Sequence, residues 1–196
     1  PWKTVEEVAQ AHLEEELGEV PEDELKKVMA ALTFIDLYVR YTFRGRAVQE
    51  LVDAGIKEYV FGDGWQLLEC RQAQNLMIMN SLDSVGCLKK LCQTKLSLNV
   101  MPWFKDGAHD RIFNSMLNGA VCLTDSSLYL DGILKDQVNS SIYTLENMDR
   151  LPEIAVRLLE NPSLMQKIAD GGYETAQAGH TWAHRAKVLH ELVEKG

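Results

Sequence analysis

Short apolar runs alternate with amphipathic segments in the middle of this chain. The apolar runs have the length of strands, and they cover residues 58–61, 75–79, 95–101, 120–123 and 141–145. The segments 83–92 and 110–117 lie between them and have the spacing of short helices. Strands that alternate with helices usually form a parallel sheet. The middle of the chain therefore predicts an α/β fold, with a parallel sheet flanked by helices.

The N-terminal part of the chain predicts helices. Thr4 begins a helix that extends to residue 17, and its Thr-x-x-Glu pattern is a capping box. A second helix begins at Pro21 and becomes apolar in its second half. We expect the triplet Arg44-Gly45-Arg46 to interrupt this helix, and a short helix over 47–53 to follow it.

The C-terminal part predicts helices over 148–160, 162–178 and 182–194. The last of them begins within the segment His180-Thr-Trp-Ala-His184, in which two histidines have the spacing of a metal pair. The pattern lacks the glutamate of His-Glu-x-x-His and a third ligand. We therefore expect Thr181 to be an N-cap, Trp182 to be a packing residue and the protein to use no metal here.

Composition and charge narrow the class of protein. An apolar content of 46% is enough for a core and argues against disorder. The sequence holds no apolar run of the roughly 20 residues that span a bilayer, and it does not open with a signal peptide. The net charge is −9, two thirds of it in residues 1–30, and no basic stripe favours nucleic acid. Because the chain begins at Pro1 without methionine, we interpret it as part of a longer protein.

The four cysteines, at positions 70, 87, 92 and 122, follow neither a disulfide framework nor a zinc pattern. Cys122 lies inside an apolar strand. We expect reduced, mostly buried thiols in a cytoplasmic protein.

The segment 106–125 carries the strongest functional signal. A polar loop leads into the helix 110–117, which is followed at once by a buried strand. The N-terminus of a helix at this place in an α/β sheet binds phosphate, because free N–H groups and the helix dipole point at the ligand. His109 and Asp110 would not face each other if both lay on the helix, and Asp110 could equally be the N-cap. Arg111 could hold a diphosphate or pair with a carboxylate.

Two further places could contribute to the same crevice. Gly62-Asp63-Gly64 directly follows the first strand, where glycine lets a backbone approach a ligand, although an ordinary tight turn explains it equally well. Arg44 and Arg46 precede that strand and could supply the cations that a diphosphate needs when no metal is present. Two exposed arginines beside a helix break are the alternative.

Several segments in the same order resemble one enzyme class. They are 60–65, 96–100, 110–119, 121–125, 158–162 and 180–185. Together they resemble the C-terminal domain of a GT-B glycosyltransferase of the group 1 type, and in pattern most of all the CgeB-like enzymes. The resemblance covers about residues 58–194. It implies a Rossmann-like domain over 56–196 that binds a nucleotide-sugar donor without metal, with residues 1–55 as a helical link and the start of that domain.

The resemblance also implies roles for residues. Many retaining GT-B enzymes carry Glu-x7-Glu on this loop and helix, and the second glutamate holds the ribose hydroxyls. The matching positions here are Asp106 and Asn114, and an asparagine can bind ribose without the charge-assisted bond of a carboxylate. The implied donor-binding residues are Gly62, Asp63, Gly64, Asp106, Gly107, His109, Arg111, Asn114, Arg44 and Arg46.

The resemblance predicts sugar transfer from a nucleotide diphosphate sugar to an acceptor. The N-terminal domain of such enzymes supplies the acceptor site, so this chain should bind a donor but not transfer its sugar alone. Two alternatives stay open: half of a nucleotide-sugar epimerase, and a non-catalytic interaction or dimerisation module on a degenerate domain.

Overall fold

The computed structural model describes residues 3–195. The α-helices are α1 (Val5–Leu17), α2 (Glu22–Ala31), α3 (Thr33–Asp53), α4 (Ser84–Leu91), α5 (Asp110–Leu117), α6 (Leu128–Asp131), α7 (Leu151–Leu159), α8 (Pro162–Gly179) and α9 (Trp182–Lys195). The strands are β1 (Glu58–Phe61), β2 (Leu76–Met79), β3 (Leu96–Asn99), β4 (Val121–Thr124) and β5 (Ser141–Ile142). Short 3-10 helices cover Trp65–Leu67, Ala73–Asn75 and Leu145–Arg150. The predicted α/β fold is confirmed.

The strands pair in parallel, as predicted, but within residues 3–195 they form two sheets. β1 pairs with β2, and β3, β4 and β5 follow one another in the second sheet. Side chains of Glu58 and Phe61 from β1 and of Leu96 and Leu98 from β3 line a cavity of about 560 Å³. The first and second sheets therefore meet at a side-chain-lined cavity.

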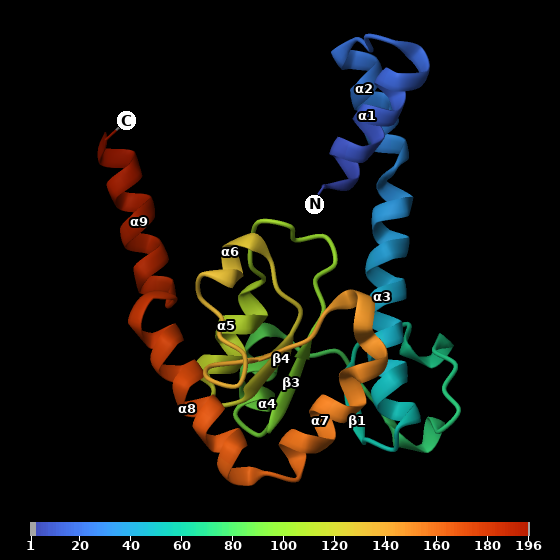
Figure 1. The fold of residues 1–196 in the computed structure, drawn as a ribbon. Coiled ribbons are helices and arrows are strands. Elements are labelled where there is room, and N and C mark those ends of the chain that lie inside the picture. Colours follow the sequence, from blue (N-terminus) through green and yellow to red (C-terminus); the bar gives the residue numbers. More distant parts are fainter. Residues whose placement is uncertain (1–2, 196) are drawn as a thin grey trace.

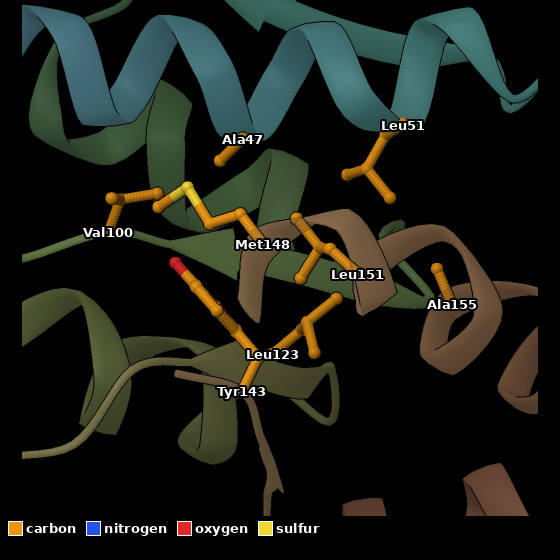
Figure 2. Close-up of a cluster of buried hydrophobic side chains, with 8 residues drawn as sticks. All are labelled: Ala47, Leu51, Val100, Leu123, Tyr143, Met148, Leu151 and Ala155. Carbon is orange, nitrogen blue, oxygen red and sulfur yellow. The ribbon is translucent and has the colours of Figure 1, made fainter. Parts of the chain in front are cut away.

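The main core lies between α3, the second sheet and α7. Figure 2 shows Leu51 of α3 facing Leu151 and Ala155 of α7, with Leu123 of β4 below them. These side chains are at most 2% exposed. Burial of such a set in one cluster is the main source of stability for the fold.

The predicted helix break at Arg44-Gly45-Arg46 is wrong, since α3 continues through it. One glycine inside a helix costs only about 1 kcal/mol relative to alanine, while Ala47, Val48, Leu51 and Val52 on the next turns are buried. Their packing outweighs the glycine. The chain breaks instead at Leu32, between α2 and α3.

Other boundaries differ by a few residues. The capping box of Thr4 with Glu7 is present, and Gly18 ends α1. The predicted helix over 148–160 is a 3-10 helix up to Arg150 and an α-helix from Leu151. Helix α6 was not predicted because four residues are too few to show a period.

Two helical arms extend away from the sheets (Figure 1). The first half of α3 carries α1 and α2, and α9 leaves the opposite flank after α8. The α3 arm exposes Phe34, Tyr38 and Tyr41, each by about two thirds. Among the described residues no helix combines the length and the apolar character needed to cross a membrane.

Candidate functional site

The N-terminus of α5 lies at the carboxyl ends of β3 and β4. Its N-cap is His109, whose Nδ1 accepts a hydrogen bond from the Arg111 backbone N–H at 3.2 Å. The Arg111 side-chain Nε lies 3.2 Å from the same Nδ1. Asp110 is therefore the first helical residue, and the expectation that it could be the N-cap is wrong.

His109 and Asp110 do contact each other, because the N-cap lies outside the helix. His109 Nδ1 is 2.6 Å from Asp110 Oδ1. Burial and the charges of Arg111 and Arg44 lower the pKa of His109, while Asp110 opposes them. With its proton on Nδ1 the ring donates to Asp110, and with its proton on Nε2 it accepts from the Arg111 amide. One histidine thus has two alternative partners at the helix N-terminus.

An arginine cluster lies beside this histidine. We use the term for Arg40, Arg44 and Arg111, together with the ring of Trp103. Arg40 Cζ and Arg44 Cζ are 4.4 Å and 4.7 Å from the centroid of that ring, within the range of cation–π attraction. Burial, and then the charges of Arg111 and Arg40, lower the pKa of Arg44. Three like charges therefore share one region.

Arg46 does not belong to the arginine cluster. Its Nε lies 3.6 Å from Glu50 Oε1 one turn further along α3. Residues two apart on a helix point about 200° apart, so the unbroken α3 separates Arg46 from Arg44. Arg40 was not predicted as a site residue. On a continuous helix its spacing of four from Arg44 places both side chains on one face, and this would have indicated it.

A buried polar layer supports the loops that follow β3 and β4. Asp125 is 3% exposed, and its Oδ1 accepts from the Met101 amide at 3.0 Å. Burial raises the pKa of Asp125 to about 7. Ser127 Oγ donates to the Gly107 carbonyl at 2.6 Å and so ties the loop before α5 to the start of α6. Asp125 was not predicted, although a polar Thr-Asp pair directly after the apolar run 120–123 could have indicated it.

A second face of α5 borders an aromatic pocket of about 360 Å³. The residues that line it are Gly107, Ala108, Asp110, Phe113, Asn114, Leu117, Tyr129, His180, Trp182 and Arg185. Asn114 Nδ2 donates to Asp110 Oδ2 at 3.1 Å. This pocket brings Gly107 and Asn114 together, but it joins them to C-terminal residues that sequence analysis had not linked to them.

The C-terminal residues of the aromatic pocket hold one another. His180 stacks on Phe113 with ring centroids 4.4 Å apart, and His180 Nδ1 lies 2.8 Å from Arg185 Nη2. Trp182, which we expected to pack, is 73% exposed at the rim. Thr181 accepts from the His184 amide, as the predicted N-cap would.

The remaining predicted residues lie elsewhere. Asp106 is exposed in the loop before α5. Gly62 and Gly64 have φ values of 103° and 90°, which favour glycine, and the Gly62 amide donates to the Met79 carbonyl of β2. Asp63 lies between them, and none of these three lines the aromatic pocket.

Two other predictions concern thiols and metals. Among the cysteines Cys122 is buried, whereas Cys87 and Cys92 are exposed and Cys70 is intermediate, so the expectation of mostly buried thiols is wrong. Residues 3–195 contain no group of three or more His, Cys, Asp or Glu side chains placed to hold a metal ion.

Solved structures share this fold. The C-terminal domain of the glycosyl transferase group 1 protein LpcC from Francisella tularensis matches with a TM-score of 0.58 at 16% identity, over 71% of this chain and 82% of that domain. Sucrose-phosphate synthase from Thermosynechococcus elongatus matches with a TM-score of 0.65 at 15% identity, over 78% of this chain and 42% of that enzyme. At these identities the likeness shows the fold alone.

A third structure, Anabaena HepE in complex with UDP-glucose, matches with a TM-score of 0.56 at 14% identity, over 74% of this chain and 44% of HepE. The chain thus spans less than half of the last two proteins. A search of curated proteins found no match.

The fold is therefore the Rossmann-like α/β fold of a C-terminal GT-B domain, a parallel arrangement flanked by helices with helical extensions at both ends. The sequence pattern of the family described as "Glycosyl transferase-like" matches residues 44–191, which is most of the chain. This protein belongs to the glycosyl transferase-like family.

Proposed function

We propose that this chain is the donor-binding domain of a glycosyltransferase that moves a sugar, of the hexosyl class, from a nucleotide diphosphate sugar to an acceptor. The observation that carries the proposal is the arginine cluster beside the N-terminus of α5. Cations and free helix N–H groups at the carboxyl ends of parallel strands are the groups that bind a diphosphate.

In this proposal the diphosphate lies against His109, Arg111 and Arg44. Asn114 holds the ribose from the aromatic pocket, where its side-chain oxygen is free to accept while its nitrogen donates to Asp110. The loop of Asp106 and Gly107 faces the sugar. Gly62, Asp63 and Gly64 after β1 complete the crevice, and Arg46 takes no part because it pairs with Glu50.

The contribution of this domain to the reaction is electrostatic. As the bond between the sugar and the diphosphate breaks, negative charge grows on the departing diphosphate. Fixed arginines and helix N–H groups stabilise that charge without reorganising. His109 contributes by position: its Nδ1 lies 2.6 Å from Asp110 Oδ1, and this contact holds the ring at the helix N-terminus beside the proposed phosphate position.

The acceptor site and the closure that excludes water belong, in this proposal, to a preceding N-terminal domain. Sucrose-phosphate synthase and HepE are more than twice as long as the part that this chain matches. We expect the 196 residues to bind a donor without a metal and to transfer no sugar until that domain is restored. A CgeB-like subtype and a cytoplasmic location are parts of the same proposal, and free thiols at exposed positions are typical of a reducing compartment.

A thermal-shift screen tests the proposal. UDP-, GDP-, dTDP- and CDP-sugars are added to the chain, each with the matching nucleoside as control, and UDP-glucose comes first because HepE binds it. A ligand at 100 times its dissociation constant adds about 2.7 kcal/mol of stability. Stabilisation by one nucleotide sugar and not by its nucleoside is the expected result. No stabilisation by any of the four would contradict the proposal.

One observation favours a second candidate, a non-catalytic dimerisation module. Phe34, Tyr38 and Tyr41 form an exposed aromatic stripe on the α3 arm, and a stripe of this kind can mark a contact surface. The two candidates separate cleanly. Dimers in light scattering that dissociate in a Tyr38→Glu variant, together with failure of the donor screen, would favour the module.

A further inference from the structure

Arg40 is the member of the arginine cluster that lies outside the family match, which begins at residue 44. It is one turn before Arg44 on α3, so the two guanidinium groups leave the same face of the helix. Both lie over the ring of Trp103. Helix α3 therefore places the positive charge of Arg40 next to Arg44, one of the predicted donor-binding residues.

The cluster has donors that the protein does not satisfy. Nε of Arg40 and Nε of Arg44 are buried and have no hydrogen-bond partner among the described residues. Arg40 Nη2 bonds to Asp36 Oδ2 at 2.7 Å, with both side chains about one third exposed. Among the described residues Arg44 has no carboxylate within ion-pair distance and Arg40 has only Asp36, so a bound anion would offset the positive charge that the cluster shares.

The number of cations indicates which anion fits. Two guanidinium groups at one ring, with Arg111 near Arg44, offer more cationic donors than a single phosphate group needs, which favours two linked phosphate groups. Arg111, in the first turn of α5, lies near enough to Arg44 for its charge to lower the pKa of Arg44. The ring of Trp103 contacts both α3 guanidinium groups and carries no net charge that would neutralise them.

We propose that Arg40 is a third cation of the diphosphate site and makes it select a diphosphate over a single phosphate. The proposal rests on the proposed function and adds a residue that the family match does not include. Asp36 bonds to Nη2 of Arg40 and so limits the positions that its guanidinium can take before a ligand binds.

The test uses inorganic pyrophosphate and orthophosphate as probes, because they do not depend on the unknown base. Their affinities for the whole chain are measured by calorimetry, for the wild type and for Arg40→Gln, Arg44→Gln and Arg46→Gln. The last variant is a matched control, since Arg46 lies on the same helix and pairs with Glu50. Unfolding temperatures without ligand show that each variant is folded.

We expect Arg40→Gln and Arg44→Gln each to weaken pyrophosphate binding about tenfold, which is about 1.4 kcal/mol, and Arg46→Gln to change it less than about twofold. Arg40→Gln should change orthophosphate binding less than about threefold. Arg40→Lys should recover most of the lost affinity because it keeps the charge.

Other outcomes overturn the proposal. If Arg40→Gln behaves like Arg46→Gln while Arg44→Gln weakens binding, Arg40 is outside the site and the proposed function stands. Equal losses for both probes, or an Arg40→Lys variant as weak as Arg40→Gln, would show that Arg40 does not select a diphosphate by charge. If the wild type binds neither pyrophosphate nor any nucleotide sugar, the proposed function fails as well.

Discussion

The two sides of helix α5 differ in how far their charged and polar side chains are paired. On the side of the arginine cluster, Arg40 and Arg44 crowd like charges together and leave buried donors without partners. On the side of the aromatic pocket, Arg185 bonds to His180 and Tyr129, and Asn114 bonds to Asp110. The cluster side carries positive charge that the protein leaves largely unpaired, whereas the polar groups of the pocket side bond to one another.

This difference separates charge recognition from shape recognition. A site with unpaired cations binds an anion most favourably. A pocket whose polar groups already bond to one another is better suited to a ligand ring, which can stack on the aromatic side chains and replace one of their hydrogen bonds. A nucleotide offers both parts in one molecule. The short α5 can address both, because its N-cap faces the cluster while Asp110 and Asn114, one turn apart, face the pocket.

The largest expected effect comes from Met116→Ala, which should destabilise α5 and so disturb the arginine cluster and the aromatic pocket together. Met116 lies fully buried on the inner face of α5, against Gly172 of α8. A buried methionine replaced by alanine costs about 2–5 kcal/mol. Urea unfolding should show this loss, whereas Leu67→Ala, at a position 80% exposed, should change stability by less than about 0.5 kcal/mol. A loss below about 1 kcal/mol would mean that α5 is held in place by other contacts.

The next effect separates the two sides. Arg111→Ala should weaken binding of a nucleoside diphosphate by about 1.5–3 kcal/mol, since a charge-assisted bond is lost. Binding of the nucleoside alone should change little. Calorimetry with both ligands measures this, with Arg46→Ala as the control on α3. Equal and small changes for the two ligands would remove Arg111 from the diphosphate site.

Local signals explain why the arginine side was largely foreseen from the sequence. The start of α5 and its His109-Asp110-Arg111 triplet follow from the apolar period and the loop before it. Arg40 was missed because Gly45 was given more weight than the four buried residues after it, and the resulting break hid the spacing of four. The His109 contact with Asp110 was missed because His109 was not recognised as the N-cap, a position outside the helix from which its ring can reach Asp110.

The aromatic pocket could not be foreseen, because it depends on tertiary packing. Phe113 meets His180 across 67 positions of sequence only because α8 packs against α5. A local pattern carries no record of such a contact. The separation of β1 from β3 is likewise a matter of packing between sheets, and strand periodicity cannot show it.

The pH dependence of stability tests the buried polar layer next to the arginine cluster, through the carboxyl group of Asp125. Its pKa is raised to about 7 from an ordinary 3.8, chiefly by burial, although the Met101 amide, Lys105 and Arg111 oppose the shift. Between those pH values the folded state holds the proton more tightly than the unfolded chain. The contribution of Asp125 to the free energy of unfolding should therefore fall as pH rises from about 4 to about 7, by at most about 1.4 kcal/mol per pH unit.

Asp125→Asn should flatten this dependence, because an amide oxygen can still accept from the Met101 N–H and carries no charge. Burial also raises the pKa of Glu58 to about 7, so part of the slope should remain until Glu58→Gln is added. Urea unfolding at several pH values measures both variants. An Asp125→Asn variant with the slope of the wild type would show that Asp125 is ionised in the folded protein throughout this range.

The smallest expected effect is on ribose binding, and it tests the aromatic pocket separately from the arginine cluster. Asn114→Ala removes the side-chain oxygen that is free to accept a ribose hydroxyl, while the Asp110 carboxylate loses one neutral donor. A neutral hydrogen bond is worth about 0.5–1.5 kcal/mol. We expect this loss for a ribonucleotide and little loss for its 2′-deoxy analogue, measured by calorimetry on the two ligands side by side. Arg111→Ala is the matched control, because it should weaken both ligands equally through the diphosphate. Equal losses in Asn114→Ala, or a fall in its unfolding temperature without any ligand preference, would make Asn114 a structural residue of α5 and leave recognition to the arginine side alone.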